Sequence, residues 1–131
     1  MAKIQYHCEL EVYQLAFDAA MKIYHLSLLF PKEERYSLTS QIRDASRSVC
    51  SNIAEGWGRR RYEAAFINKL NESESEARET QCWLQFAVKC KYMSQEDGAS
   101  LHSTYNKIIG KLVNMANNPK PWLLKAKLQK D

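Results

Sequence analysis

Apolar residues recur along this chain at alternating intervals of four and three, and this spacing limits the possible folds more than any other feature. The first series is Val12, Ala16, Ala19, Ile23, Leu26 and Phe30. Because an α-helix turns once in about 3.6 residues, such a series lies along one helical face. The chain also contains only 4 glycines and 3 prolines in 131 residues. This shortage of turn residues disfavours β-sandwiches and barrels, so the sequence predicts an all-α protein.

Four segments carry the helical pattern, at about residues 9–30, 35–55, 62–90 and 95–117. Short connections make consecutive helices antiparallel, which predicts an up-down-up-down four-helix bundle formed by a single domain, residues 1–131. We expect Gly56 to end the second helix in a left-handed C-cap. The tail, residues 119–131, is interpreted either as a short docked helix or as a frayed arm.

Positive charge is concentrated in two parts of the chain. The formal net charge is +4, and residues 31–62 and 95–131 each carry +3. Such clustering favours an anionic partner. Three adjacent arginines follow the second helix, and two more stand one turn apart within it, where they could extend the basic patch. The candidate nucleic-acid-binding residues are therefore Arg43, Arg47, Arg59, Arg60 and Arg61.

Two aromatic residues, Trp57 and Tyr62, flank the three arginines, and either could stack on an unpaired base. A second interpretation remains open. The cations would complement the negative C-terminal pole of the second helix, and Trp57 would fill the end of the bundle.

Two longer stretches resemble a bacterial protein family: residues 30–43 (FPKEERYSLTSQIR) and residues 51–60 (SNIAEGWGRR). Three shorter elements follow the same pattern in the same order, at residues 10–14, 79–81 and 92–94. The pattern is similar to that of the four-helix-bundle family named for the protein encoded in intervening sequences of 23S ribosomal RNA genes. The resemblance covers about residues 9–94. The chain departs from it at Cys50, usually a proline, and at Asp44, often a basic residue.

The resemblance implies a homopentamer of four-helix protomers. It also suggests kinship with the accessory variability determinant of diversity-generating retroelements, a basic pentamer that binds nucleic acid and a reverse transcriptase. We place the aromatic residues Tyr13, Phe17 and Tyr24 at the subunit interface, because a small bundle should not leave such a strip exposed. A pentamer would carry a charge of about +20, so weak contacts in each subunit could act together.

No catalytic motif is present, so we expect no enzymatic activity, no catalytic residue and no cofactor. We expect no metal site either, because no glutamate stands three residues before any of the three histidines. Asn52 and Glu55 are interpreted as a buried hydrogen-bonding anchor between helices. The four cysteines lack paired spacing and are expected to be reduced thiols.

The N-terminal residues show no secretory signal, and the longest apolar run is too short for a membrane span, so we expect a cytoplasmic protein without a membrane partner. Two functions stay open. The first is a non-enzymatic oligomer that binds RNA or DNA through a basic surface. The second is a scaffold that binds a protein partner and has no nucleic-acid role.

Overall fold

The computed structural model describes residues 3–125, which form four α-helices. They are α1 (Glu11–Ser27), α2 (Leu38–Trp57), α3 (Glu63–Lys89) and α4 (Gln95–Asn117). Three short 3-10 helices accompany them, at His7–Glu9, Lys32–Glu34 and Lys120–Trp122. This part of the chain contains no β-strand, which confirms the all-α prediction.

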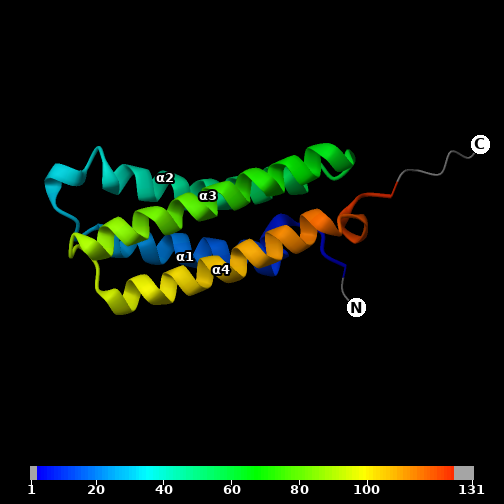
Figure 1. Cartoon of the computed structure of the whole chain (residues 1–131). Coiled ribbons are helices and arrows are strands. Elements are labelled where there is room, and N and C mark those ends of the chain that lie inside the picture. The colour runs from blue at the N-terminus through cyan, green and yellow to red at the C-terminus, as the bar shows by residue number, and fades with distance from the viewer. Residues whose placement is uncertain (1–2, 126–131) are drawn as a thin grey trace, which may run out of the picture.

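The helices run alternately up and down along a common axis (Figure 1). Helix α1 packs against α2 and α4, and α3 packs against the same two helices, so each helix has two neighbours. One end of the bundle holds the N-terminal segment, the α2–α3 turn and the C-terminal segment (Figure 1). The opposite end holds the α1–α2 connection and the α3–α4 turn. None of the helices described is long and apolar enough to cross a lipid bilayer.

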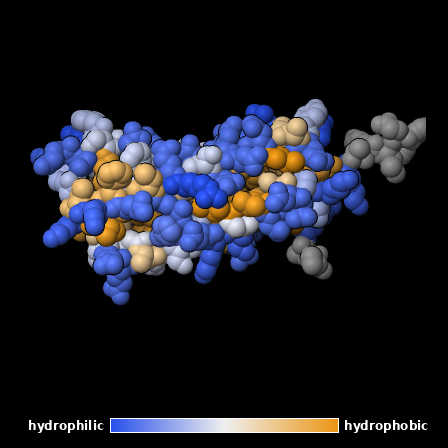
Figure 2. Space-filling view, in the orientation of Figure 1, coloured by the Kyte–Doolittle hydropathy of each residue, from blue (hydrophilic) through white to orange (hydrophobic). Residues whose placement is uncertain are grey.

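The predicted apolar faces meet in one core. In α1 the residues Val12, Ala16, Ala19 and Ile23 are buried, as their spacing predicts. The largest fully buried side chain is Tyr105 of α4. Burying one large apolar side chain contributes about 1.5–3 kcal/mol, so this core supplies most of the stability. The face shown in Figure 2 is mostly polar, with one group of hydrophobic residues near the end opposite the termini and others along the middle and towards the terminal end.

Helix α1 is shorter than the predicted 9–30. Its N-cap, Leu10, has extended backbone angles, and the helix ends at Ser27. Residues 28–30 form a turn before Pro31, because a proline disfavours helical backbone at the residue before it. Phe30 is nevertheless buried, so the apolar spacing marks a buried position three residues beyond the end of α1 at Ser27.

Helix α2 begins at Leu38 rather than near residue 35, because Glu34 organises the preceding turn. The Glu34 carboxylate accepts hydrogen bonds from the Ser37 hydroxyl, the Leu38 backbone N–H and the Tyr92 hydroxyl, the last at 2.9 Å. These donors hold the pKa of Glu34 below its ordinary value, the Ser37 hydrogen bond contributing most. The Tyr92 bond also ties the α1–α2 connection to the α3–α4 turn.

The C-cap prediction for Gly56 is wrong. No glycine in the described chain has a positive φ, and α2 continues through Gly56 to Trp57. A Cβ added at Gly56 would lie 3.1 Å from the Lys69 Cβ of α3, so this glycine permits close helix packing instead. The left-handed position is Lys91, with φ of 64°, after α3. There the Tyr92 N–H donates to the Ala87 carbonyl at 2.9 Å, which closes a Schellman motif.

The first part of the tail is docked, as one of the two interpretations predicted. The Trp122 ring meets the Trp57 ring edge to face, with centroids 6.3 Å apart. The Leu124 N–H donates to the Arg60 carbonyl at 3.2 Å. Residues 126–131 of the predicted tail lie outside the described residues.

Candidate nucleic-acid interface

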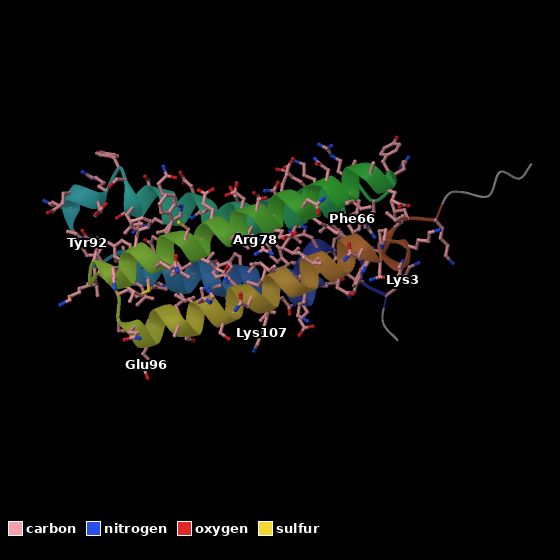
Figure 3. All side chains as sticks on the ribbon, in the orientation of Figure 1. Lys3, Phe66, Arg78, Tyr92, Glu96 and Lys107 are labelled. Atoms are coloured by element: carbon pink, nitrogen blue, oxygen red, sulfur yellow. The ribbon has the colours of Figure 1, made fainter. Side chains whose placement is uncertain are left out.

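The three adjacent arginines lie in the turn between α2 and α3. Residues 58–62 connect the two helices, with the Arg59 N–H donating to the Gly56 carbonyl and the Tyr62 N–H to the Arg59 carbonyl. The N-terminal and C-terminal segments reach the same end; Figure 3 shows Lys3 there and Tyr92 at the opposite end. We call this end, formed by residues 3–10, 58–62 and 118–125, the arginine end.

The three arginines have different surroundings. Arg59 and Arg61 are exposed, whereas Arg60 is half-buried. The guanidinium carbon of Arg60 lies 3.6 Å from the centroid of the Trp57 ring, and its Nε donates to the Trp57 carbonyl at 2.7 Å. Burial lowers the pKa of Arg60. Arg60 is therefore held in place against the indole, and its two neighbours extend into solvent.

The two flanking aromatic residues also differ. Trp57 is only 7% exposed, and its Nε1–H donates to the Gln5 carbonyl at 3.0 Å. It fills the end of the bundle and presents no open ring face for stacking on a base. Tyr62 is 64% exposed and can offer its ring to a ligand.

Arg43 and Arg47 form a separate group. The Arg43 Nε donates to the Ser27 hydroxyl at 2.7 Å, and both guanidinium carbons lie over the Tyr24 ring, at 5.0 and 5.9 Å from its centroid. At 1.5 Å per residue, Arg47 stands roughly 15 Å along α2 from the end of the helix at Trp57, where the arginine turn begins. These two arginines do not extend the arginine end.

The predicted interface residues lie along α1. Tyr13 stacks on Phe17 with ring centroids 6.0 Å apart, and Phe17 is 48% exposed. Met21 continues the exposed apolar strip on the same helix, and Leu28 extends it just after the helix ends. Tyr24 lies beside it under the two arginines, so a predicted interface residue and two predicted nucleic-acid contacts share one surface.

The predicted anchor pair does not form as expected. The Asn52 side chain donates to the Ser48 carbonyl of its own helix, and Glu55 is exposed and pairs with Lys69 at 2.8 Å. The buried hydrogen bond between α2 and α3 comes from Ser73, whose hydroxyl donates to the Val49 carbonyl at 2.8 Å. Ser73 is buried among apolar positions of α3, and a serine at such a position needs a hydrogen-bond partner.

The four cysteines differ in burial. Cys50 is buried, which raises the pKa of its thiol to about 11 and leaves it protonated. Cys8, Cys82 and Cys90 are exposed free thiols. Within residues 3–125, no three His, Cys, Asp or Glu side chains are grouped to hold a metal ion.

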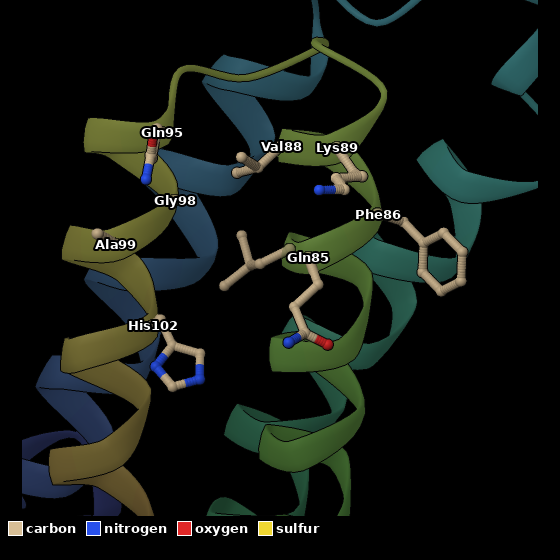
Figure 4. Close-up of a pocket in the computed structure, with 9 residues that line it drawn as sticks. Gln85, Phe86, Val88, Lys89, Gln95, Gly98, Ala99 and His102 are labelled. Atoms are coloured by element: carbon tan, nitrogen blue, oxygen red, sulfur yellow. The ribbon is translucent and has the colours of Figure 1, made fainter.

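Sequence reasoning missed an aromatic surface at the end opposite the arginine end. Trp83 and Phe86 of α3 lie with ring centroids 5.9 Å apart, and Tyr36 is 85% exposed nearby. Beside Phe86 a groove of about 520 Å³ runs between α3 and α4 (Figure 4). The exposure of Phe86 has no counterpart in the apolar spacing, because it lies between the buried positions Leu84 and Ala87 of α3 rather than on one of them.

Comparison with known proteins identifies the family. The model of the 23S rRNA-intervening sequence protein family matches residues 8–114. The chain belongs to this family. No curated protein matches it.

A solved structure similar to this chain comes from Bacteroides thetaiotaomicron. It is a protein of unknown function from the S23 ribosomal protein family, 26% identical in sequence, with a TM-score of 0.72. The match covers 81% of this chain and 95% of the other. The family match at residues 8–114 includes α1, α2, α3, the turn with the three arginines and most of α4. Residues 115–125 lie beyond the match.

Proposed function

We propose that this chain is a non-enzymatic, ring-forming bundle of the cytoplasm that binds RNA or DNA through the arginine end. One observation carries the proposal: basic residues from three distant segments meet at that end. They are Lys3, Arg59, Arg60, Arg61, Lys120 and Lys125. Among the residues that define the arginine end, Glu9 is the one carboxylate. It accepts hydrogen bonds from the Gln5 and Tyr6 N–H groups.

The exposed guanidiniums of Arg59 and Arg61 are suited to phosphate. A guanidinium presents its N–H donors as a planar fork that can hold two phosphate oxygens at once. Contacts of this kind fix position without reading base sequence, so we expect little sequence preference. Exposed Tyr62 adds a ring on which a base can stack.

We further propose that five copies assemble in a ring through the apolar strip of α1. Phe17 and Met21 are exposed on α1 and Leu28 just after its end, and an exposed apolar strip is commonly an interface. Five arginine ends on one assembly would bind one long strand cooperatively by raising its effective concentration.

Fluorescence anisotropy of a labelled single-stranded RNA of about ten nucleotides, and of a duplex DNA, tests the binding proposal. If about four phosphates are neutralised, log K should fall with log salt at a slope near −3 for the single strand. Arg59→Ala with Arg61→Ala should make that slope shallower by about 1.4 and weaken binding about tenfold or more.

The matched control is Lys89→Ala with Lys107→Ala, which removes the same charge from exposed positions away from the arginine end. It should bind nearly as the wild type does. If the wild type binds neither probe even at about 50 mM salt, the nucleic-acid function is wrong.

The second candidate function is a scaffold that binds a protein. The aromatic surface of exposed Tyr36, exposed Phe86 and half-buried Trp83 favours it, because aromatic rings at the surface beside an apolar groove are typical of protein interfaces. A scaffold would retain its partner at high salt and in the arginine double variant, whereas phosphate binding would be lost under both conditions.

A further inference from the structure

The arginine end contains a cavity of about 560 Å³ that the sequence analysis did not anticipate. Its walls come from the N-terminal segment, the end of α2 with the following turn, and the docked C-terminal segment. The residues that line it include Lys3, Trp57, Arg60, Trp122 and Lys125. The volume falls within the range of small-ligand pockets, and a single nucleotide fits such a space.

One wall of this cavity is formed by the Arg60 guanidinium stacked on the Trp57 indole. The indole of Trp57 is fixed by its hydrogen bond to the Gln5 carbonyl. The Arg60 guanidinium lies over that ring at 3.6 Å and is held there by its hydrogen bond to the Trp57 carbonyl. One face of the guanidinium therefore covers the indole, and Arg60 also lines the cavity. A guanidinium plane held in this way is a stacking platform for a nucleobase.

The second wall is the Trp122 ring, which is half-buried and meets Trp57 at 66°. Because the two rings are steeply inclined, Trp122 borders the platform rather than covering it. The Leu124 N–H to Arg60 carbonyl bond keeps this segment beside the turn. The cavity thus has a cationic floor and an aromatic side.

Charge selects the ligand. Three cations line the cavity, Lys3, Arg60 and Lys125, and no carboxylate is among its described lining residues. Exposed Arg59 and Arg61 stand beside it on the same turn. A ligand with a flat aromatic part and an adjoining negative charge matches this arrangement on both counts.

We propose that this cavity takes one unpaired nucleotide of a single strand, its base stacked on the Arg60 guanidinium beside Trp122 and its phosphate near Lys3 and Lys125. The inference rests on the proposed function and deepens it, since a paired base in a duplex is already stacked and cannot enter. The arginine end therefore prefers single-stranded over double-stranded nucleic acid.

Tryptophan fluorescence tests this inference directly. In a Trp83→Phe background the remaining tryptophans are Trp57 and Trp122, both at the cavity. We expect an oligouridine of about ten nucleotides to quench this fluorescence saturably, and a blunt duplex with the same number of phosphates to leave it nearly unchanged.

Arg60→Lys keeps the charge but removes the planar guanidinium, and it should weaken oligouridine binding about five- to tenfold. Trp122→Ala should weaken it to a similar degree, and Trp122→Phe should restore most of the affinity because a ring remains. Lys107→Ala, on the middle of α4 (Figure 3), is the control for loss of charge. Thermal melting establishes that each variant is folded.

The outcomes separate the two proposals. If Arg60→Lys and Trp122→Ala bind oligouridine as the wild type does while Arg59→Ala with Arg61→Ala weakens it, the nucleic-acid function stands and the cavity proposal is overturned. Equal quenching by duplex and single strand overturns it too. If neither probe binds at low salt, both proposals are wrong.

Discussion

At the arginine end, side chains of the same type have different surroundings. Arg59, Arg60 and Arg61 are adjacent and identical in sequence, yet only Arg60 is held against Trp57. The direction of the chain through the α2–α3 turn decides which guanidinium meets the ring, and no local pattern encodes that direction. The sequence therefore predicted the basic cluster but not the separate role of Arg60.

The role of Glu34 is likewise not visible from its residue type. It joins the α1–α2 connection to the α3–α4 turn by accepting a hydrogen bond from Tyr92. Its folded-state pKa lies below the ordinary value of 4.5 because Ser37, Leu38 and Tyr92 donate to it. Its contribution to stability is therefore present above the ordinary pKa and is lost as the pH falls through the folded-state pKa.

We predict that Glu34→Gln lowers the urea midpoint of unfolding near neutral pH. The difference from the wild type should narrow as the pH falls from about 7 to about 3, because the wild-type carboxylate becomes protonated. Glu33→Gln changes the same charge at the exposed neighbouring position and serves as the control. A constant gap between Glu34→Gln and the wild type across this range would contradict the account.

At the scale of elements, Gly56 permits the close approach of α2 and α3, and Gly98 that of α3 and α4. A Cβ at Gly98 of α4 would lie 2.3 Å from the Val88 Cγ2 of α3, whereas one at Gly110 meets nothing within 4 Å. Because valine is stiff about its first side-chain torsion, this methyl cannot move aside freely. Gly98 therefore permits the α3–α4 contact, and Gly110 has no packing role.

We predict opposite effects for two substitutions in one helix. Gly98→Ala should destabilise the protein by about 1–2 kcal/mol, because overpacking outweighs the gain in helix propensity. Gly110→Ala should stabilise it by about 0.5–1 kcal/mol. Denaturant unfolding measures both. The idea is refuted if the two substitutions change stability in the same direction.

Helix number and core faces could be predicted from the sequence because apolar spacing reports burial along a regular helix. Helix ends could not, since Leu10, Glu34 and Lys91 set them through backbone angles and side-chain bonds that leave no periodic signal. The Trp57–Trp122 contact, 65 residues apart, needed the fold itself.

At the scale of the whole molecule, polar and apolar surfaces occupy different places. The arginine end is basic, the opposite end exposes aromatic rings, and α1 exposes an apolar strip. The three proposed roles, strand binding, protein binding and self-assembly, are therefore assigned to different surfaces of the bundle.

We predict that Tyr13→Glu with Phe17→Glu reduces the assembly to single chains of 15.2 kDa, because two carboxylates would be buried in the proposed interface. Size-exclusion chromatography with light scattering measures the mass. Tyr36→Glu, outside α1 at the end of the bundle opposite the arginine end, is the control and should leave the assembly intact. A double variant that keeps the wild-type mass would place the interface elsewhere.

The most direct test of the central claim compares the two arginine groups. Arg59→Ala with Arg61→Ala and Arg43→Ala with Arg47→Ala remove equal charge from two places on the same protein. Binding of a single-stranded RNA of about ten nucleotides is measured for both at one salt concentration. We predict that the first pair weakens binding about tenfold or more and the second by less than about threefold. If the second pair weakens it as much as the first, the arginine end is not the binding surface.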